Sequence, residues 1–392
     1  QAHQDDGNRC GAPGIPADLG EAEEKVRQLA ADLAKAEAPH QHRVKAAAAG
    51  DQAQRGSVQT EQQITDYRRL FLDDVPMLDV RAPVEFAGGA FPHSSNLALL
   101  NDDERHRIGI CYKEQGQQAA IELGHQLVGG KTRETRMAAW KQWAAQHPHG
   151  VLYCFRGGLR SQTVQQWLHD DGVEIPLVSG GYKALRRFLL NELDKQIQQL
   201  PLVVLCGPTG SGKTRVIEKL DNSIDLEGIA HHRGSAFGRR PGGQPSQIDF
   251  ETALSVEMLK QSSSNPRQIV LEDESRLIGR CYVPVPLQEK IRDGARVLIE
   301  ESLQSRVEVT LEDYVLGPLA EYRHWFADQA EEKLGEELLA SIDRIRRRLG
   351  GVRHQQLREL LLQALKEQRD NADASLHRLW IEPLLRDYYD PM

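Results

Sequence analysis

A short apolar run followed at once by a glycine-rich loop constrains the fold of this chain more than any other feature. Leu202–Cys206 has the composition of a buried strand, and residues 207–214 have the pattern G-x-x-x-x-G-K-T. A helix-compatible stretch, Arg215–Leu220, comes next. In this strand–loop–helix order, the pattern predicts a loop whose backbone N–H groups surround phosphate oxygens. A glycine-rich turn that only packs a helix is the alternative, and it is disfavoured because all eight positions of 207–214 fit.

The side chains of this loop have expected roles. Lys213 would neutralise a pair of phosphates, and the Thr214 hydroxyl would bind Mg²⁺. Downstream, Gln268–Glu274 is an apolar strand that ends in three acids. Such a strand favours an outer metal ligand at Glu272 or Asp273, the alternative being a solvated acidic turn. The predicted diphosphate ligands are Gly207, Gly210, Ser211, Gly212, Lys213 and Thr214, and the predicted metal ligands are Thr214, Asp273 and Glu272.

A second loop earlier in the chain places a cysteine beside glycines and arginines. Val151–Tyr153 predicts a short strand, Cys154 ends it, and the following loop holds two glycines and two arginines before a helical run, Gln162–Leu168. Glycines let backbone N–H groups turn inward as an anion nest, and the helix adds its positive end. A cysteine there should react as thiolate. We therefore predict Cys154 as the catalytic residue, with Arg156 and Arg160 stabilising negative charge, over a structural strand-end cysteine.

The order of predicted elements indicates an α/β fold with mainly parallel sheets. From Asp66 onward, short apolar strands alternate with helical stretches, and ligands of such sheets bind at the carboxyl ends of strands. The tail, residues 1–60, is rich in Ala, Gln, Glu and Gly and has one expected helix, residues 17–38. The expected order is this tail, an α/β domain at 62–185, a helical connector at 186–200, and a P-loop α/β domain with C-terminal helices at 201–392.

Composition excludes several classes of protein. Forty per cent hydrophobic and 27% charged residues are ordinary for a soluble globular chain, and no apolar run has the length of a membrane span. The five cysteines show no paired spacing, which argues against disulfides or zinc and for a reducing, cytoplasmic location. These cysteines are Cys10, Cys111, Cys154, Cys206 and Cys281.

A net charge of −8 means that any contact with nucleic acid must depend on local basic patches. One candidate is the loop that carries His232 and Arg233, and Arg276 is a further anion or RNA contact. The run 344–348 contains four arginines, and it is either a solvated helix face or a phosphate-binding patch.

Several motifs around Cys154 resemble a rhodanese domain. They are the D-V-R-x-P-x-E pattern of 79–85, the turn at 91–97, the cysteine loop and Gly180-Gly181-Tyr182. The resemblance implies that Cys154 carries a persulfide or a related adduct. Five residues separate Cys154 from Arg160, one more than in common sulfurtransferase loops. That length also resembles rhodanese-fold phosphatases, in which Asp79 is the candidate general acid, so both chemistries stay open.

The two loops in one chain resemble the family of bacterial tRNA 2-selenouridine synthases. Further motifs of that family are residues 109–116, 225–238, 272–276 and 388–391. The resemblance implies two steps at a tRNA wobble uridine: geranylation of 2-thiouridine by geranyl diphosphate, then replacement by selenium from selenophosphate. It implies tRNA as a partner and selenophosphate synthetase as the selenium source. The sequence gives no sign of a membrane partner and leaves the oligomeric state open, with a monomer favoured. Cys111 is the second candidate thiol. The alternatives are a rhodanese-fold phosphatase or an ATP-dependent tRNA sulfurtransferase, and a P-loop that binds a nucleotide instead of geranyl diphosphate.

Overall fold

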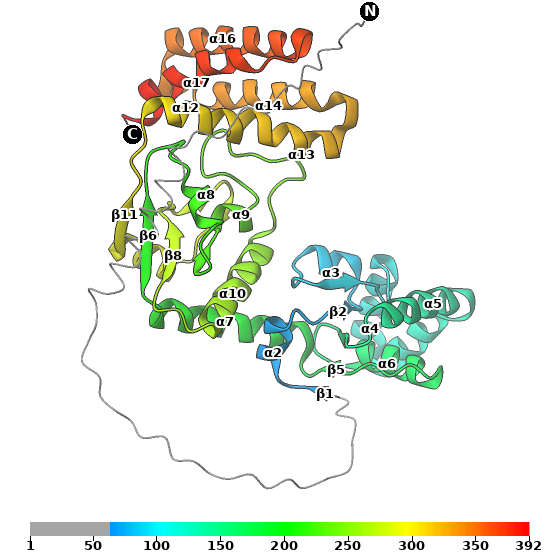
Figure 1. The fold of residues 1–392 in the computed structure, drawn as a ribbon. Helices are drawn as coiled ribbons and strands as arrows, with labels where there is room; N and C mark the ends of the chain where they lie inside the picture. The colour runs from blue at the N-terminus through cyan, green and yellow to red at the C-terminus, as the bar shows by residue number, and fades with distance from the viewer. Residues whose placement is uncertain (1–62, 392) are drawn as a thin grey trace, which may run out of the picture. The chain divides into compact units, whose positions relative to one another are not determined.

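Two parallel β-sheets, one small antiparallel pair of strands and a helical C-terminal part make up the described fold, in agreement with the predicted α/β class (Figure 1). The computed structural model describes residues 63–391, all of which lie in one compact unit of the chain. The predicted tail and its helix lie outside the described residues. Among the helices of the described part, none is long and apolar enough to cross a membrane.

The first sheet brings the cysteine loop and the D-V-R motif to one edge. Its five parallel strands have the order β1-β5-β4-β2-β3. β2 lies between β4 and β3, with Asp79 opposite both Tyr153 and Asn96, so the segments that follow these strands share the carboxyl edge. The elements are β1 (Gln63–Ile64), α2 (Tyr67–Leu72), β2 (Met77–Asp79), α3 (Pro83–Ala87), β3 (Ser94–Asn96), α4 (Asp102–Leu127), α5 (Gly130–Gln146), β4 (Val151–Tyr153), α6 (Leu159–Asp170) and β5 (Leu177–Val178).

The second sheet carries the P-loop. Its parallel strands have the order β11-β6-β8-β7, and Leu205 of β6 pairs with Glu272 of β8. This register puts the P-loop and the acidic strand end at the same edge. The elements are α7 (Gly181–Gln199), β6 (Leu202–Cys206), α8 (Lys213–Ile217), β7 (Ser223–Ile224), α9 (Leu226–Ile229), α10 (Gln247–Ser263), β8 (Ile269–Glu272), β9 (Leu277–Ile278), β10 (Cys281–Tyr282), α11 (Val285–Asp293) and β11 (Ala295–Leu298).

Helices α7 and α10 pack into the cores of both sheets. Leu185, Leu189 and Leu193 of α7 recur every four residues and form one buried stripe, as an amphipathic helix requires. The first two belong to the core under the first sheet, and Leu193 belongs to the core under the second. The predicted connector is therefore the later part of a longer helix that begins at Gly181.

The helix after the P-loop begins earlier than the sequence pattern suggests. α8 spans Lys213–Ile217, whereas the apolar pattern predicts Arg215–Leu220. Gly212 precedes α8 at φ 78°, a left-handed conformation that favours glycine and turns the chain directly from loop to helix. Lys213 and Thr214 therefore sit in the first turn of α8.

The C-terminal helices, yellow to red in Figure 1, form a separate apolar core together with Phe237. Trp380 and Leu361 lie at its centre without exposure to solvent. The elements are α12 (Leu303–Leu311), η1 (Glu312–Leu316), α13 (Gly317–Phe326), η2 (Ala327–Gln329), α14 (Ala330–Arg344), α15 (Arg346–Leu349), α16 (Gly351–Asn371), η3 (Ser375–His377), α17 (Arg378–Leu384) and η4 (Leu385–Tyr389).

A buried histidine makes this core sensitive to acid. The Trp380 indole donates to Nδ1 of His377 at 2.9 Å, and Nε2 lies 2.8 Å from Oε1 of Gln368, so the neutral ring satisfies both partners. Burial lowers the pKa of His377 to about 4. Its stabilising contribution is therefore present above pH ~6.5 and is lost as the pH falls towards ~4, by ~3 kcal/mol in all.

We expect the melting temperature of the protein to fall between pH 7 and pH 4.5 by more than that of a His377→Gln variant, whose side chain does not titrate. Thermal unfolding followed by circular dichroism over this pH range checks the difference. A His149→Gln variant, changed at an exposed histidine, is the control and should follow the parent protein. Equal pH dependence in the parent protein and His377→Gln would contradict the assignment.

Candidate functional site

The thiol of Cys154 lies at the carboxyl end of β4, where the sequence pattern predicts it. The side chain is 3% exposed, and its Sγ lies 3.1 Å from the hydroxyl of Ser161 on α6. That hydroxyl is itself 3.0 Å from the carbonyl of Gly158, the residue at the start of α6. Ser161 therefore fixes the thiol against the first turn of the helix. The sequence pattern assigns Ser161 no role, although its place one turn into α6 is a local signal.

The Gly180-Gly181-Tyr182 motif packs against the backbone of the cysteine loop. A Cβ on Gly181 would overlap the carbonyl of Cys154, and Gly181 has φ 57°. The N–H of Tyr182 donates to that same carbonyl at 2.9 Å, and the N–H of Lys183 donates to Phe155 at 3.0 Å. Glycine is thus required because the start of α7 and the cysteine loop approach each other closely, which is a physical reason for this motif.

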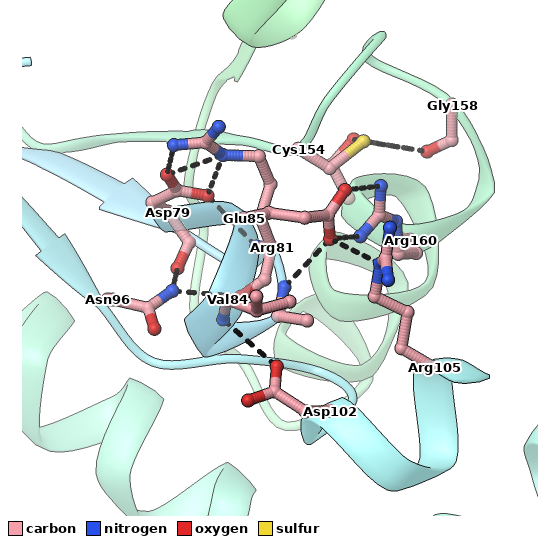
Figure 2. Close-up of polar contacts among 12 residues, drawn as sticks. Asp79, Arg81, Val84, Glu85, Asn96, Asp102, Arg105, Cys154, Gly158 and Arg160 are labelled. Atoms are coloured by element: carbon pink, nitrogen blue, oxygen red, sulfur yellow. Dashed lines mark hydrogen bonds and ion pairs between the residues drawn. The ribbon is translucent and has the colours of Figure 1, made fainter. Parts of the chain in front are cut away.

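The two arginines of the loop have different environments, and Figure 2 shows that of Arg160. Arg160 contacts Glu85 at 2.5 Å, and Arg105 approaches the same carboxylate at 3.3 Å. Burial alone would raise the pKa of Glu85, but the hydrogen bond and charge of Arg160 hold it below its ordinary value. Arg156 is exposed and has no carboxylate partner within residues 63–391. Arg156 is therefore free to bind an anion, whereas the charge of Arg160 is shared with Glu85.

Asp79 cannot serve as a free general acid in this arrangement. Its carboxylate pairs with Arg81 at 2.7 Å, and both side chains are buried (Figure 2). The Arg81 guanidinium in turn lies 3.8 Å from the ring centroid of Tyr182. The D-V-R motif is thus a buried ion pair, and the phosphatase alternative loses its only candidate acid. Cys111, the second candidate thiol, is a buried residue of α4.

A cavity of about 680 Å³ opens above Cys154. Ligand pockets commonly have volumes of this order. Charged and apolar groups share its wall: Arg156 and Arg105 lie among the former, and Val84, Leu159 and Ile248 among the latter. Ile248 comes from α10, so the part of the chain that carries the P-loop also contributes to this cavity.

Side chains of the P-loop contact the loop backbone and the end of β8. Lys213 Nζ donates to the carbonyl of Gly207 at 2.9 Å, and the Thr214 hydroxyl donates to Glu272 Oε1 at 2.9 Å. Ser211 Oγ is buried and has no hydrogen-bond partner among the described residues. The structure thus brings together Lys213, Thr214 and Glu272 as the motif predicts.

Three glutamates converge beside Thr214. Oxygens of Glu227, Glu272 and Glu274 lie within 4.8 Å of one another. Burial, reinforced by the charge of Glu227, raises the pKa of Glu272 to about 8 and that of Glu274 to about 9. Glu272 Oε2 is buried with no hydrogen-bond partner in the described part of the chain. Because hard divalent cations prefer oxygen ligands, this donor set fits Mg²⁺.

Asp273 does not join this cluster, contrary to the expected ligand set. Its carboxylate pairs with Arg296 of β11 at 2.8 Å and accepts from Cys206 Sγ. Successive side chains of an extended segment point to opposite faces, so Glu272 and Glu274 face one way and Asp273 the other. This alternation is readable in the sequence, whereas Glu227, 45 residues before Glu272, has no local signal.

An ion pair ties the C-terminal end of the chain to the P-loop. Arg306 of α12 is 5% exposed, pairs with Asp390 at 2.6 Å and donates to the carbonyl of Thr209 at 2.9 Å. A Cβ on Gly210 would collide with the hydroxyl of Thr310 on the same helix. The Tyr-Tyr-Asp-Pro motif thus supports the loop through Arg306, a connection that sequence reasoning missed.

The residues predicted to contact anions or RNA differ in their exposure to solvent. His232 is buried, and burial lowers the pKa of its ring, so it is a structural residue and not a surface contact for RNA. Arg233 is half-buried. Arg276 is exposed, with its guanidinium 5.4 Å from the ring centroid of Tyr282. The arginines of α15 are exposed at the start of the α15–α16 turn.

A parallel sheet with a P-loop, converging carboxylates and helices that brace the loop define a P-loop α/β protein. Residues 200–392 match the family described as the tRNA 2-selenouridine synthase AAA domain. A tRNA 2-selenouridine synthase of Alcanivorax borkumensis is 64% identical over 83% of this chain and 91% of that protein. One from Marinobacter nauticus is 55% identical over 83% of this chain and 89% of its own length. The chain belongs to the tRNA 2-selenouridine synthase family.

Proposed function

We propose that this protein converts 2-thiouridine at the wobble position of tRNA to 2-selenouridine in two steps. The first is geranylation of sulfur by geranyl diphosphate, and the second is replacement of the geranylated sulfur by selenium from selenophosphate. Family membership supports the tRNA modification. The observation that supports the division into two steps is that two separate loops differ in their chemistry. One is the P-loop with Lys213, and the other carries Cys154 at a cavity lined by arginines.

The P-loop is suited to the first step. The thiocarbonyl sulfur attacks the first carbon of the geranyl group, the C–O bond breaks and diphosphate leaves. Negative charge grows on the departing oxygen, so Lys213 and the loop N–H groups stabilise the transition state more than the ground state. Thr214, Glu272 and the neighbouring glutamates would hold Mg²⁺, which neutralises further diphosphate charge when bound.

The cysteine loop is suited to the second step. A thiocarbonyl sulfur leaves poorly, but once alkylated it leaves as geranylthiol and C2 becomes open to a selenium nucleophile. Water cleaves the P–Se bond of selenophosphate to give phosphate and selenide. Selenide then displaces a small thiol from the mixed disulfide that the oxidised form of this thiol makes with Cys154, so that Cys154 holds the selenium as Sγ–Se⁻. Arg156 with the loop N–H groups stabilises the negative charge of this adduct. Selenium bonds to C2, the C2–S bond breaks and geranylthiol leaves. The small thiol then attacks Sγ, which breaks the Sγ–Se bond, releases 2-selenouridine and restores the mixed disulfide. Selenophosphate synthetase is the proposed source of the donor.

Mass spectrometry of tRNA nucleosides tests the proposal. The protein with geranyl diphosphate, Mg²⁺ and 2-thiouridine tRNA should produce S-geranyl-2-thiouridine. Addition of selenophosphate and a thiol reductant should then produce 2-selenouridine. Selenouridine formed without any geranylated intermediate, even when geranyl diphosphate is omitted, would contradict the two-step order.

The carboxylate cluster gives a separate prediction about the metal. Glu272→Gln should weaken Mg²⁺ binding roughly 10- to 100-fold, since it removes a donor that also orients Thr214. Asp273→Asn is the matched control, because Asp273 faces Arg296, and should leave Mg²⁺ affinity unchanged. Calorimetric titration with Mg²⁺ in the presence of inorganic diphosphate measures both. Without metal, Glu272→Gln should be at least as stable as the parent at neutral pH. The raised pKa of Glu272 means that folding carries the cost of protonating this carboxyl group, and glutamine avoids that cost. Loss of affinity in Asp273→Asn alone would contradict the assignment.

A further inference from the structure

Three aliphatic side chains stand exposed around the cavity above Cys154. Val84 of α3 is 53% exposed, Leu159 of α6 is 49% exposed, and Ile248 of α10 is 37% exposed. They come from three different helices and line the same cavity. Single exposed aliphatic residues are common on protein surfaces, but three around one polar pocket indicate a ligand with an apolar part.

Backbone contacts hold these aliphatic side chains at the cavity. A Cβ on Gly89 would overlap the Ile248 side chain, so the glycine lets α10 approach the loop. The carboxylate of the next residue, Asp249, accepts from the N–H of Ala90 at 2.8 Å and anchors the start of α10 there. The N–H of Val84 donates to Asp102 at 2.9 Å, as Figure 2 shows. The apolar wall is thus a built feature of the cavity.

A carrier of selenium needs only the anion-binding part of this cavity. Arg156 and the loop N–H groups meet that requirement, and they leave the aliphatic wall without a function. The chemistry of the second step supplies one. The sulfur that leaves C2 is bonded directly to the prenyl chain, so a selenium atom on Cys154 can reach C2 only when that chain lies next to the cavity.

We propose that Val84, Leu159 and Ile248 bind the geranyl chain of S-geranyl-2-thiouridine while selenium on Cys154 attacks C2. This assignment rests on the proposed function and adds to it the specificity of the second step. The wall selects the alkylated nucleoside over the unalkylated one, and it holds the leaving group beside the cysteine. The P-loop binds the diphosphate of the donor, whereas this wall binds the hydrocarbon after transfer.

The test compares two RNA substrates in single variants. Anticodon stem-loops carrying S-geranyl- or S-methyl-2-thiouridine are converted by protein that is supplied with selenophosphate and a thiol reductant. Leu159→Ser and Ile248→Ser should each raise the KM for the S-geranyl RNA roughly 10-fold, with little change in kcat, because each removes aliphatic contact with the chain. The KM for the S-methyl RNA should not change. Val352→Ser, at a 74% exposed position of α16, is the control and should change neither value.

The possible results separate this inference from the proposed function. Equal effects of Leu159→Ser on both RNAs would overturn the inference, because the wall would then contact the base or the RNA and not the chain. Unchanged KM values in both variants would also overturn it. If the parent protein converts neither RNA, the proposed function itself fails. Direct binding of the two stem-loops, followed by fluorescence anisotropy, should show the same loss for the S-geranyl RNA alone.

Discussion

Replacement of Cys154 by serine will reduce selenium incorporation by roughly a thousandfold or more, while geranylation of 2-thiouridine continues. Serine preserves the size of the side chain and its place beside Ser161, but its hydroxyl is a far weaker nucleophile and cannot carry selenium as a thiolate does. The variant should therefore accumulate S-geranyl-2-thiouridine. Nucleoside mass spectrometry after incubation with both co-substrates measures the ratio of geranylated to selenated product.

Cys111→Ser is the matched control for this experiment. Cys111 is buried in α4, and its thiol has no hydrogen-bond partner among the described residues, so serine there should leave both products unchanged. Retention of normal selenium transfer in Cys154→Ser, or its loss in Cys111→Ser alone, would show that the wrong thiol has been assigned.

Lys213→Ala should lose geranylation by roughly 100- to 1,000-fold but still convert pre-geranylated tRNA to selenouridine. Lys213 donates to the loop carbonyl of Gly207, and in the proposed mechanism its positive charge stabilises the diphosphate leaving group. Loss of this side chain should therefore slow geranylation, the first step. In the proposed mechanism, the second step uses the cavity above Cys154 and needs no diphosphate. Separate assays with 2-thiouridine tRNA and with pre-geranylated tRNA measure the two rates.

An exposed lysine of α16, Lys366, provides a control for the loss of one positive charge from the protein. Lys366→Ala should retain both activities, because it removes a positive charge outside the P-loop. A strict requirement for ATP hydrolysis in the geranylation step would contradict the assignment of geranyl diphosphate to this loop and favour a nucleotide. Loss of selenium transfer from pre-geranylated tRNA in Lys213→Ala would likewise contradict the division between the two sites.

The sequence predicted the positions of the P-loop and the cysteine loop because each is encoded in consecutive residues. Residues 207–214 need only a preceding strand and a following helix to surround a phosphate, and Cys154 with its glycines has the same local requirement. Backbone geometry over fewer than ten residues decides such features, and the glycines at positive φ are visible in the sequence. The alternation of strands and helices likewise indicated parallel sheets.

Tertiary structure alone decided which charged side chains meet at these loops. Glu85 neutralises Arg160 from 75 positions away, and Glu227 joins Glu272 only because of where α9 and β8 lie at the sheet edge. Asp390 reaches Arg306 across the C-terminal helices. Such contacts depend on strand order, register and helix packing, which combine segments distant in sequence. The sequence therefore identifies the two loops locally. The ion pairs, the cluster of glutamates and the aliphatic side chains around these loops come together only when distant segments pack against one another.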